Sequence, residues 1–154
     1  MNTQETLEIN SHRGKYIAQF RESIFEFSNF DLAKKIFIID SKVASLYGDQ
    51  LKKILNSELC LLIEATEENK SLHKFTHHIE QLTSLGIRRG DTLVAIGGGI
   101  IQDITCFLAA TLFRGLDWIF YPTTLLAQAD SCIGSKSSIN VGSLKNLLGT
   151  FTPP

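Results

Sequence analysis

Residues 92–113 read TLVAIGGGIIQDITCFLAATLF, and this stretch decides the fold. Its first part, 93–96, is continuously apolar, which is typical of a strand buried on both faces of a sheet. Three glycines follow, and beyond them Ile100, Ile104, Phe107, Leu108 and Thr111 fall on one side of a predicted helix. The segment is therefore predicted to be a strand, a tight turn and a helix in direct succession.

The same pattern of a strand followed by a helix extends outward on both sides. Residues 36–39 (IFII) end in the helix-capping signal Asp40-Ser41, and 60–63 (CLLI) and 118–121 (WIFY) are two further apolar runs. Residues at helical spacing follow each run: Val43, Leu46, Tyr47, Leu51, Ile54 and Leu55, then Leu72, Phe75, Ile79, Leu82 and Leu85, then Leu125, Leu126 and Ala129. This alternation predicts an α/β fold with a Rossmann-like parallel sheet flanked by helices on both faces.

The N-terminal part of the chain has a different pattern. Residues 7–9 and 16–20 are short apolar or alternating runs around a His12-Arg13-Gly14 turn. Such a pattern predicts a small hairpin ahead of the sheet.

Composition and charge exclude several classes of function. A chain of 154 residues with 44% hydrophobic content fits one domain. Its net charge of -1 provides no basic field, so we expect no nucleic acid and no membrane partner. No stretch has the length of a bilayer span, and the three cysteines form no C-x-x-C pair. A soluble protein of the reducing cytoplasm is expected.

Candidate ligand-binding residues follow from the predicted sheet, because ligands bind beyond the carboxyl ends of parallel strands. Asp40, residues 66–70 (TEENK), the three glycines, Thr123 and Thr124 occupy those ends. Glycines allow a pyrophosphate to approach the backbone and the helix dipole behind them. However, GGGIIQD lacks the G-x-G-x-x-G spacing, and three glycines can also simply form a tight turn. Both interpretations stay open at this point.

Two other polar groups also admit alternatives. Thr123 and Thr124 can cap a helix or donate to a ligand, and the residues alone favour capping. Residues 131–140 (SCIGSKSSIN), with Asp130 before them and Lys145-Asn146 after them, are either a solvated loop or a cradle for an anionic substrate. The residues alone favour the loop.

The histidines and cysteines give no catalytic signal. His73 and His77 are one helical turn apart and His78 adjoins them, so a pair of metal ligands is conceivable. No third ligand and no H-E-x-x-H pattern accompany this pair, and the three histidines are expected to lie off the apolar face of the helix, so no metal site is predicted. Cys106 is expected to be a core thiol, and Cys132 lies in the small-residue segment.

Five segments, taken together, resemble the hallmark segments of dehydroquinate synthases and their sugar phosphate cyclase relatives. They are GGGIIQD (97–103), ATLFRG (110–115), PTTLLAQADS (122–131), IGSKSSIN (133–140) and KNLLGTF (145–151). Each is a weak signal alone, whereas their order and near-identical spacing are specific. The resemblance runs from about residue 37 to residue 154, and it implies a dehydroquinate synthase-like N-terminal domain that binds NAD.

The resemblance also implies roles for individual positions. Asp40 and Lys42 match contacts to the adenosine end of NAD, although the family often has asparagine in place of Lys42. The other implied cofactor-binding residues are Glu67, Lys70, Gly97, Gly98, Gly99, Asp103, Thr123, Thr124 and Lys145. The implied catalytic and substrate-binding residues are Asp130, Lys136, Asn146 and Arg114. Arg114 matches an arginine that reaches the substrate phosphate in the neighbouring subunit, so the resemblance implies a homodimer.

The implied activity is that of a carbon–oxygen lyase of the 3-dehydroquinate synthase type, acting on a seven-carbon sugar phosphate in aromatic biosynthesis. In that family NAD takes a hydride from an alcohol, phosphate is eliminated, the hydride returns, and an aldol step closes the ring. A divalent metal, zinc or cobalt, is held by a glutamate and two histidines of a helical C-terminal domain. Residues 1–154 are therefore expected to be the NAD-binding α/β domain alone, truncated before that domain and inactive by themselves.

Departures from the family pattern leave other substrates and activities open. Gln102 replaces a glycine that is usual in dehydroquinate synthases, and Ser135 replaces the second glycine of G-G-K-T. Residues 141–144 (VGSL) replace the common H-P-L-G. A cyclase for sedoheptulose or glucose phosphates is therefore an alternative. A metal- and NAD-dependent alcohol or glycerol dehydrogenase is another, although such enzymes usually carry G-T-G-S-E where this chain has LLAQADS. The last alternative is a non-catalytic fragment.

Overall fold

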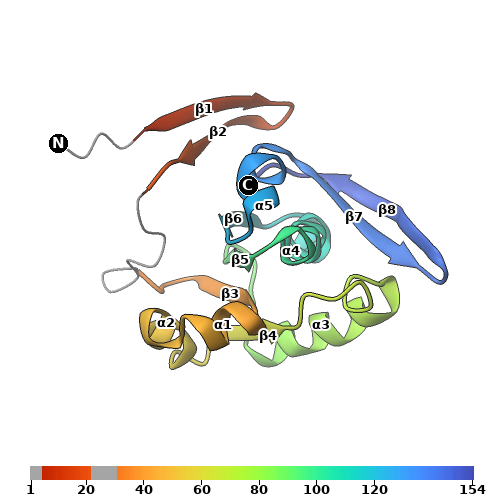
Figure 1. Cartoon of the computed structure of the whole chain (residues 1–154). Helices are drawn as coiled ribbons and strands as arrows, with labels where there is room; N and C mark the ends of the chain where they lie inside the picture. The colour runs from red at the N-terminus through yellow and green to blue at the C-terminus, as the bar shows by residue number, and fades with distance from the viewer. Residues whose placement is uncertain (1–4, 22–30) are drawn as a thin grey trace.

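A four-stranded parallel sheet forms the centre of the molecule (Figure 1). The computed structural model describes residues 5–21 and 31–154. The strands, in the order β4-β3-β5-β6, are β4 (Cys60–Ile63), β3 (Lys35–Asp40), β5 (Thr92–Gly97) and β6 (Asp117–Pro122). The parallel register pairs Ile39 with Ile96, and Gly97 with Pro122. The predicted parallel α/β fold is confirmed, and all four strands end at the same edge.

Helices cover both faces of the sheet, because alternate residues of each buried strand point to opposite sides. On one face α1 (Ser41–Leu46) and α2 (Gly48–Leu55) pack against Phe37, Ile39, Val94 and Ile96. On the other face α3 (Leu72–Ser84) and α4 (Gly99–Thr111) pack against Ile36, Ile38, Leu93 and Ala95. All eight strand residues are at most 3% exposed, as expected of strands that read as continuous apolar runs.

The residues at helical spacing after β3 form two short helices instead of one. Asp40 caps α1 as predicted, since its Oδ1 accepts from the N–H of Lys42 at 3.0 Å. Tyr47 has φ -123° and ψ 30° and ends α1, and α2 begins at Gly48, a residue with poor helix propensity. Leu46, expected on the apolar side, is consequently 65% exposed.

The two longer helices bury different residues from those that periodicity predicted. In α3 the buried residues are Phe75, His78 and Leu82, whereas Leu72 and Ile79 are exposed. In α4 burial extends around the helix and includes Gln102 and Thr105. The reason is visible in Figure 1, where α4 lies between the sheet and a hairpin, β7–β8, that covers its other side.

Two hairpins complete the fold. The N-terminal one, β1 (Thr6–Ser11) with β2 (Gly14–Gln19), confirms the prediction. The second, β7 (Lys136–Val141) with β8 (Leu144–Phe151), replaces the loop expected at 131–140. Three short elements connect β6 to β7 and α4 to β6: α5 (Leu125–Ala129), η3 (Ser131–Ile133) and η2 (Leu112–Arg114). Among the described residues, no helix combines the length and apolar character needed to cross a bilayer.

Candidate functional site

The glycine turn at the end of β5 has two parts with different functions. An added Cβ at Gly97 would lie 2.6 Å from Cγ1 of Ile101, and one at Gly98 would lie 2.9 Å from Cγ2 of Thr124. Both residues are buried, so close packing alone requires glycine there. Gly99 is exposed, and a Cβ there would meet no atom within 4 Å. Packing therefore accounts for glycine at positions 97 and 98, whereas the space at Gly99 is open.

The N-terminus of α4 begins at Gly99 and has no side-chain cap. Gly98 is the N-cap, and the first helical hydrogen bond runs from the N–H of Gln102 to the carbonyl of Gly98 at 3.0 Å. The amides before Gln102 therefore have no intrahelical partner, and the helix dipole adds about half a positive charge at this end. A diphosphate fits these groups, because it supplies both the acceptors and the negative charge.

The neighbouring loops close around this turn. The N–H of Thr123 donates to the carbonyl of Gly97 at 2.9 Å, which fixes the end of β6 beside the glycines. Thr124 caps α5, since its Oγ1 accepts from the N–H of Ala127 at 3.3 Å. The capping interpretation of Thr124 is thus confirmed. Lys42 has an exposed side chain beyond Asp40, at the same edge of the sheet.

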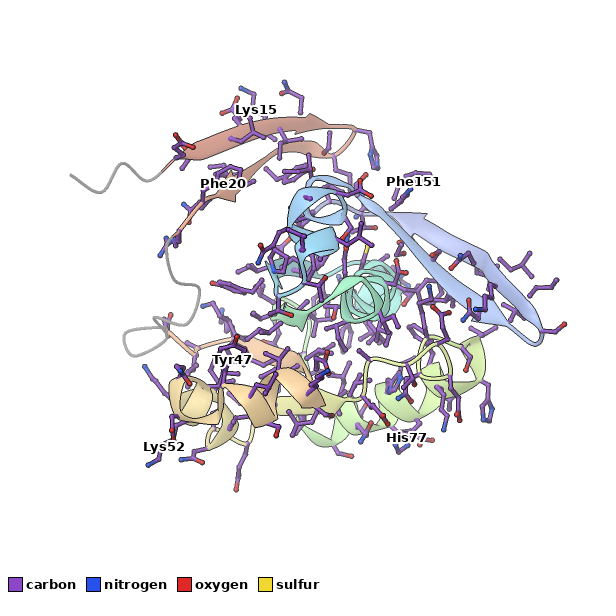
Figure 2. The ribbon with its side chains drawn as sticks, in the orientation of Figure 1. Lys15, Phe20, Tyr47, Lys52, His77 and Phe151 are labelled. Carbon is purple, nitrogen blue, oxygen red and sulfur yellow. The ribbon has the colours of Figure 1, made fainter. Side chains whose placement is uncertain are left out.

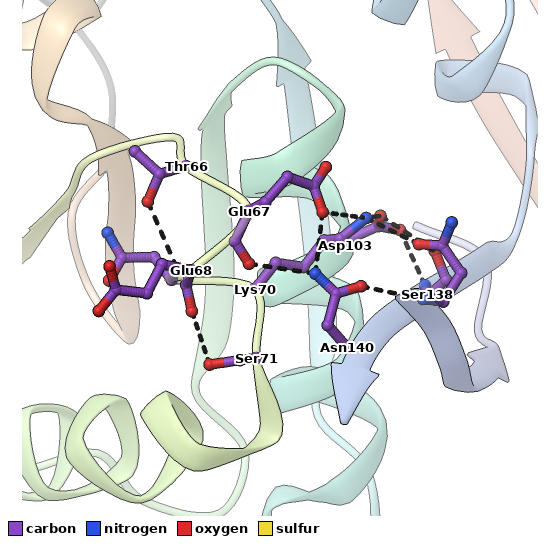
Figure 3. A network of polar contacts seen from close by, with 10 residues as sticks. Thr66, Glu67, Glu68, Lys70, Ser71, Asp103, Ser138 and Asn140 are labelled. Atoms are coloured by element: carbon purple, nitrogen blue, oxygen red, sulfur yellow. Dashed lines mark hydrogen bonds and ion pairs between the residues drawn. The ribbon is translucent and has the colours of Figure 1, made fainter. Parts of the chain in front are cut away.

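A polar network lies one helical turn further along α4 (Figure 3). Its centre is Lys70, which is 6% exposed. The Nζ of Lys70 lies 3.1 Å from Oδ2 of Asp103 and 2.9 Å from Oδ1 of Asn146, with Oε2 of Glu67 at 3.9 Å. Asp103 is four residues after Gly99, about 6 Å along the helix axis. The buried ammonium is stable here because oxygen atoms from three segments surround it.

Glu67 presents an anionic acceptor at the surface of this network. Its side chain is 48% exposed, and a hydrogen bond from Nδ2 of Asn140, at 2.8 Å, holds the pKa of the carboxyl below its ordinary value. The positive charges of Lys70 and Lys145 lower this pKa further, against an opposing effect of burial. Glu67 is therefore a carboxylate at neutral pH, suited to accept hydrogen bonds from hydroxyl groups of a ligand.

Two members of the network were not predicted from the sequence, Ser138 and Asn140. The N–H of Ser138 donates to Oδ1 of Asp103 at 2.9 Å, and its hydroxyl donates to Oδ1 of Asn146 at 2.9 Å. A signal for this strand was present: Gly142-Ser143 is a two-residue hairpin turn between the runs 136–141 (KSSINV) and 144–151 (LKNLLGTF). Gly142 has φ +59°, as such a turn requires.

Three of the predicted site residues lie apart from this network. Asp130, Lys136 and Arg114 have exposed side chains, and within residues 5–21 and 31–154 these form no hydrogen bond or ion pair. Arg114 follows the far end of α4, about 20 Å from the glycine turn by helix length. Phe113 and Arg114 have φ of 52° and 70°, an uncommon left-handed backbone for residues other than glycine.

The histidines do not form a metal site. His77 is exposed on the outer side of α3 (Figure 2), whereas His78 is 3% exposed and its Nε2 lies 3.0 Å from the carbonyl oxygen of Asn69. The prediction that all three histidines lie off the packed face was wrong for His78. No group of three potential metal ligands occurs within the described residues, so the divalent metal has no fitting site on them. Cys106 is a buried core thiol, as predicted.

Comparison with known sequences identifies one family. The family described as 3-dehydroquinate synthase N-terminal matches residues 60–154. The 3-dehydroquinate synthase of Thermodesulfovibrio yellowstonii is 42% identical over 130 residues, which are 81% of this chain and 36% of that enzyme. The chain thus spans about a third of the length of the curated relatives that it matches.

Solved structures give the same result. A crystal structure of 2-deoxy-scyllo-inosose synthase superposes with a TM-score of 0.81 at 30% identity, over 97% of this chain and 45% of that one. The same enzyme has been solved with carbaglucose-6-phosphate, NAD⁺ and Co²⁺. The 2-epi-5-epi-valiolone synthase of Streptomyces hygroscopicus, with NAD⁺ and Zn²⁺ bound, superposes at 0.73 and 28% identity, over 86% of this chain and 39% of that one. A glycerol dehydrogenase from Schizosaccharomyces pombe, at 0.56 and 20% identity over 84% of this chain and 32% of that one, shares the fold alone.

Proposed function

The chain belongs to the family of 3-dehydroquinate synthases and related sugar phosphate cyclases, and from this we propose that it is the NAD-binding domain of a 3-dehydroquinate synthase-type enzyme. The proposed reaction is phosphate elimination and ring closure on a seven-carbon sugar phosphate. The observation that carries the proposal is the unobstructed backbone at Gly99, at the uncapped N-terminus of α4.

The cofactor would lie along the carboxyl edge of the sheet. The amides at the start of α4 would bind its diphosphate, with Gly97 and Gly98 allowing the backbone to turn and Thr123 and Thr124 beside them. Asp40 and Lys42 would contact the adenosine end. When bound, NAD supplies reversible hydride transfer.

The polar network would hold the cofactor's hydroxyl groups. Glu67 is charged and half exposed, so it can accept hydrogen bonds from a ribose. Asp103 neutralises Lys70, and this leaves Lys145 as an exposed cation near Glu67 that is available to an anionic ligand. The two lysines therefore contribute differently: Lys70 fixes the geometry, and Lys145 attracts charge.

The substrate would approach from the hairpin side. Asn146 is fixed by Lys70 and Ser138, and we propose that it binds the sugar phosphate together with Asp130 and Lys136. Arg114 lies beyond the C-terminal end of α4 and outside the polar network that fixes Asn146. We therefore propose a homodimer in which Arg114 binds the substrate phosphate of the partner subunit.

The chain spans about a third of the length of its relatives, so further parts of the site would lie outside residues 1–154. We propose that residues 1–154 are one NAD-binding domain, that the metal is held by a further helical domain, and that these residues alone do not turn over substrate. A cytoplasmic location fits the three free cysteines.

A single substitution tests the cofactor site. Gly99→Asp adds a carboxylate to the space above the α4 amides without an internal clash, because no atom lies within 4 Å. We expect NAD affinity, followed by amide chemical shifts during a titration, to fall at least tenfold, about 1.4 kcal/mol. The melting temperature should not fall, because an acidic side chain at a helix N-terminus stabilises by about 0.3–1 kcal/mol.

Gly48→Asp provides the matched control. Gly48 is the first residue of α2, is likewise free of atoms within 4 Å of its Cβ position, and lies in a helix unrelated to the glycine turn. This variant should bind NAD like the native chain. Failure of the native chain to bind NAD, or equal affinities of the native chain and Gly99→Asp, would contradict the proposed function.

A further inference from the structure

The carboxamide of Asn140 is buried and bonded at both ends. Its Nδ2 donates to Oε2 of Glu67 at 2.8 Å and to the carbonyl oxygen of Glu67 at 3.1 Å. Its Oδ1 accepts from the backbone N–H of Asn146 at 2.9 Å. The side chain thus joins the loop after β4 to strand β8, with the residue 6% exposed to solvent.

The backbone of Asn140 also bonds to the loop after β4. Its N–H donates to the carbonyl of Lys70 at 3.0 Å, and a parallel bridge pairs it with Ser71. The ladder between β7 and β8 is irregular between Ile139 and Val141, which releases Asn140 from cross-strand pairing. The strand therefore gives up regular pairing at the position that bonds to the loop of Glu67.

Asn146 is held in an uncommon conformation by the same contacts. Its φ is 54°, a left-handed value that asparagine tolerates better than most residues. Asn140 fixes its backbone N–H, while Lys70 and Ser138 fix its Oδ1. Removal of Asn140 would leave the side chain held and the backbone free to relax.

We propose that Asn140 is a positioning residue that transmits the state of Glu67, on the cofactor side of the site, to Asn146, on its substrate side. The assignment of the two sides rests on the proposed function. The physical basis is the conjugated carboxamide: a carboxylate that accepts from Nδ2 polarises the group and strengthens Oδ1 as an acceptor. Loss of the charge on Glu67, or its engagement by a ligand, weakens the bond to the N–H of Asn146.

A titration without ligand tests the connection. The backbone amide of Asn146 is followed by ¹⁵N-resolved NMR while pH falls from 7 through the acid range, and the side-chain carboxyl carbon of Glu67 is followed in parallel. In the native chain we expect the Asn146 amide to shift with the same midpoint as Glu67. In Asn140→Ala this shift should fall by at least half.

Other charged groups face Glu67 and require controls. They are Lys70 of its own loop, Asp103 of α4 and Lys145 of β8. Glu67→Gln removes the response that belongs to Glu67 and leaves any response to Asp103. Ser138→Ala is the matched control on β7, because Ser138 contacts Asn146 and Asp103 but not Glu67, and its response should be native. An undiminished response in Asn140→Ala would mean that the signal passes through Lys70, and the inference would be wrong.

Asn140→Asp keeps the inference testable if the alanine variant does not fold. This near-isosteric change retains an acceptor for Asn146 but replaces the donor to Glu67 with a carboxylate. The pKa of Glu67 should rise above its native value, measured at its own carboxyl carbon. An unchanged Glu67 titration would overturn the proposed connection.

A second arm uses saturating NAD. In the native chain the amides of both Gly99 and Asn146 should shift, whereas in Asn140→Ala the Gly99 shift should remain and the Asn146 shift should fall by at least half. If Gly99 does not respond in the native chain, the proposed function fails, and the ligand-free titration still decides the role of Asn140. If both amides shift in Asn140→Ala as much as they do in the native chain, Asn140 does not connect the two sides.

Discussion

The glycine turn and the polar network lie one helical turn apart on α4 and are built in opposite ways. At the turn, the absence of side chains has two effects. It lets Gly97 and Gly98 pack closely against Ile101 and Thr124, and it leaves open space at Gly99. In the network, Lys70 is surrounded by side chains from the loop after β4, from α4 and from β8. The turn is local in sequence, whereas contacts of Lys70 join residues up to 76 positions apart.

This difference determines how each region responds to substitution. In a turn defined by packing, a substitution should reduce stability only where the added Cβ meets a neighbour, so substitutions of the three glycines should have different effects. A buried charge cluster should fail when any partner is removed, because the remaining charge stays buried without compensation. Stability measurements on single variants therefore distinguish the two designs.

The largest effect is expected at the centre of the network. Lys70→Met removes the ammonium from between Asp103 and Asn146, with the Asp103 side chain only 19% exposed. We expect the free energy of unfolding to fall by about 3 kcal/mol, measured by urea denaturation at neutral pH. Lys74→Met is the control, since its ion pair with Glu68 is more exposed, and it should cost less than about 1 kcal/mol. Equal losses in both variants would show that Lys70 is no more important than a surface lysine.

The fold was predictable to a large extent because its elements are local. The runs at 36–39 and 93–96 are buried on both faces, and their continuous apolar character records that burial directly, whereas the edge strand at 60–63 leaves Leu62 49% exposed. Periodicity was less informative for α4, because the β7–β8 hairpin covers the side that would otherwise face solvent. A helix buried on two sides has no polar face to mark its orientation.

The site was predictable only where a residue type has one physical purpose. A run of glycines between a strand and a helix restricts the possibilities, and the resemblance named Glu67, Lys70, Asp103 and Asn146, which the structure brings together. Asn140 was missed because an asparagine after small residues is typical of a loop. Its burial results from contacts with residues 67 and 70, a pairing across the chain that no local pattern records.

A smaller effect, with opposite signs at neighbouring positions, is expected within the turn. Gly97→Ala would bring a Cβ within 2.6 Å of the buried side chain of Ile101, and we expect a loss of about 1–3 kcal/mol from overpacking. Gly99→Ala meets no atom within 4 Å and should stabilise by about 0.5 kcal/mol through the unfolded chain. Thermal denaturation of the two variants gives the comparison. Equal destabilisation would mean that Gly99 is also required by packing, and the ligand space would not exist.

The smallest effect is the pH dependence of stability that His78 contributes, and it concerns the loop that carries Lys70, not the glycine turn. Burial is the main cause that lowers the pKa of His78, whose Nε2 contacts the carbonyl of Asn69 next to Lys70. The bond to Asn69 and a contact with Gln81 oppose this shift, while the charges of His77 and Lys74 add to it. The residues of the glycine turn have no titratable side chain.

The sign follows from the lowered pKa. The unfolded chain binds a proton near pH 6.5, before the folded protein does, so the contribution of neutral His78 is complete above that pH. It is lost as pH falls from there through the folded pKa. His78→Gln keeps a donor for the Asn69 carbonyl and removes the titration, so urea midpoints should fall less between pH 7 and pH 5 than in the native chain. His73→Gln, at an exposed position of α3 and not among the groups that shift the pKa of His78, should retain the native slope. A native slope in His78→Gln would mean that His78 is not buried in its neutral form, and the loop carrying Lys70 would not be anchored as the structure shows.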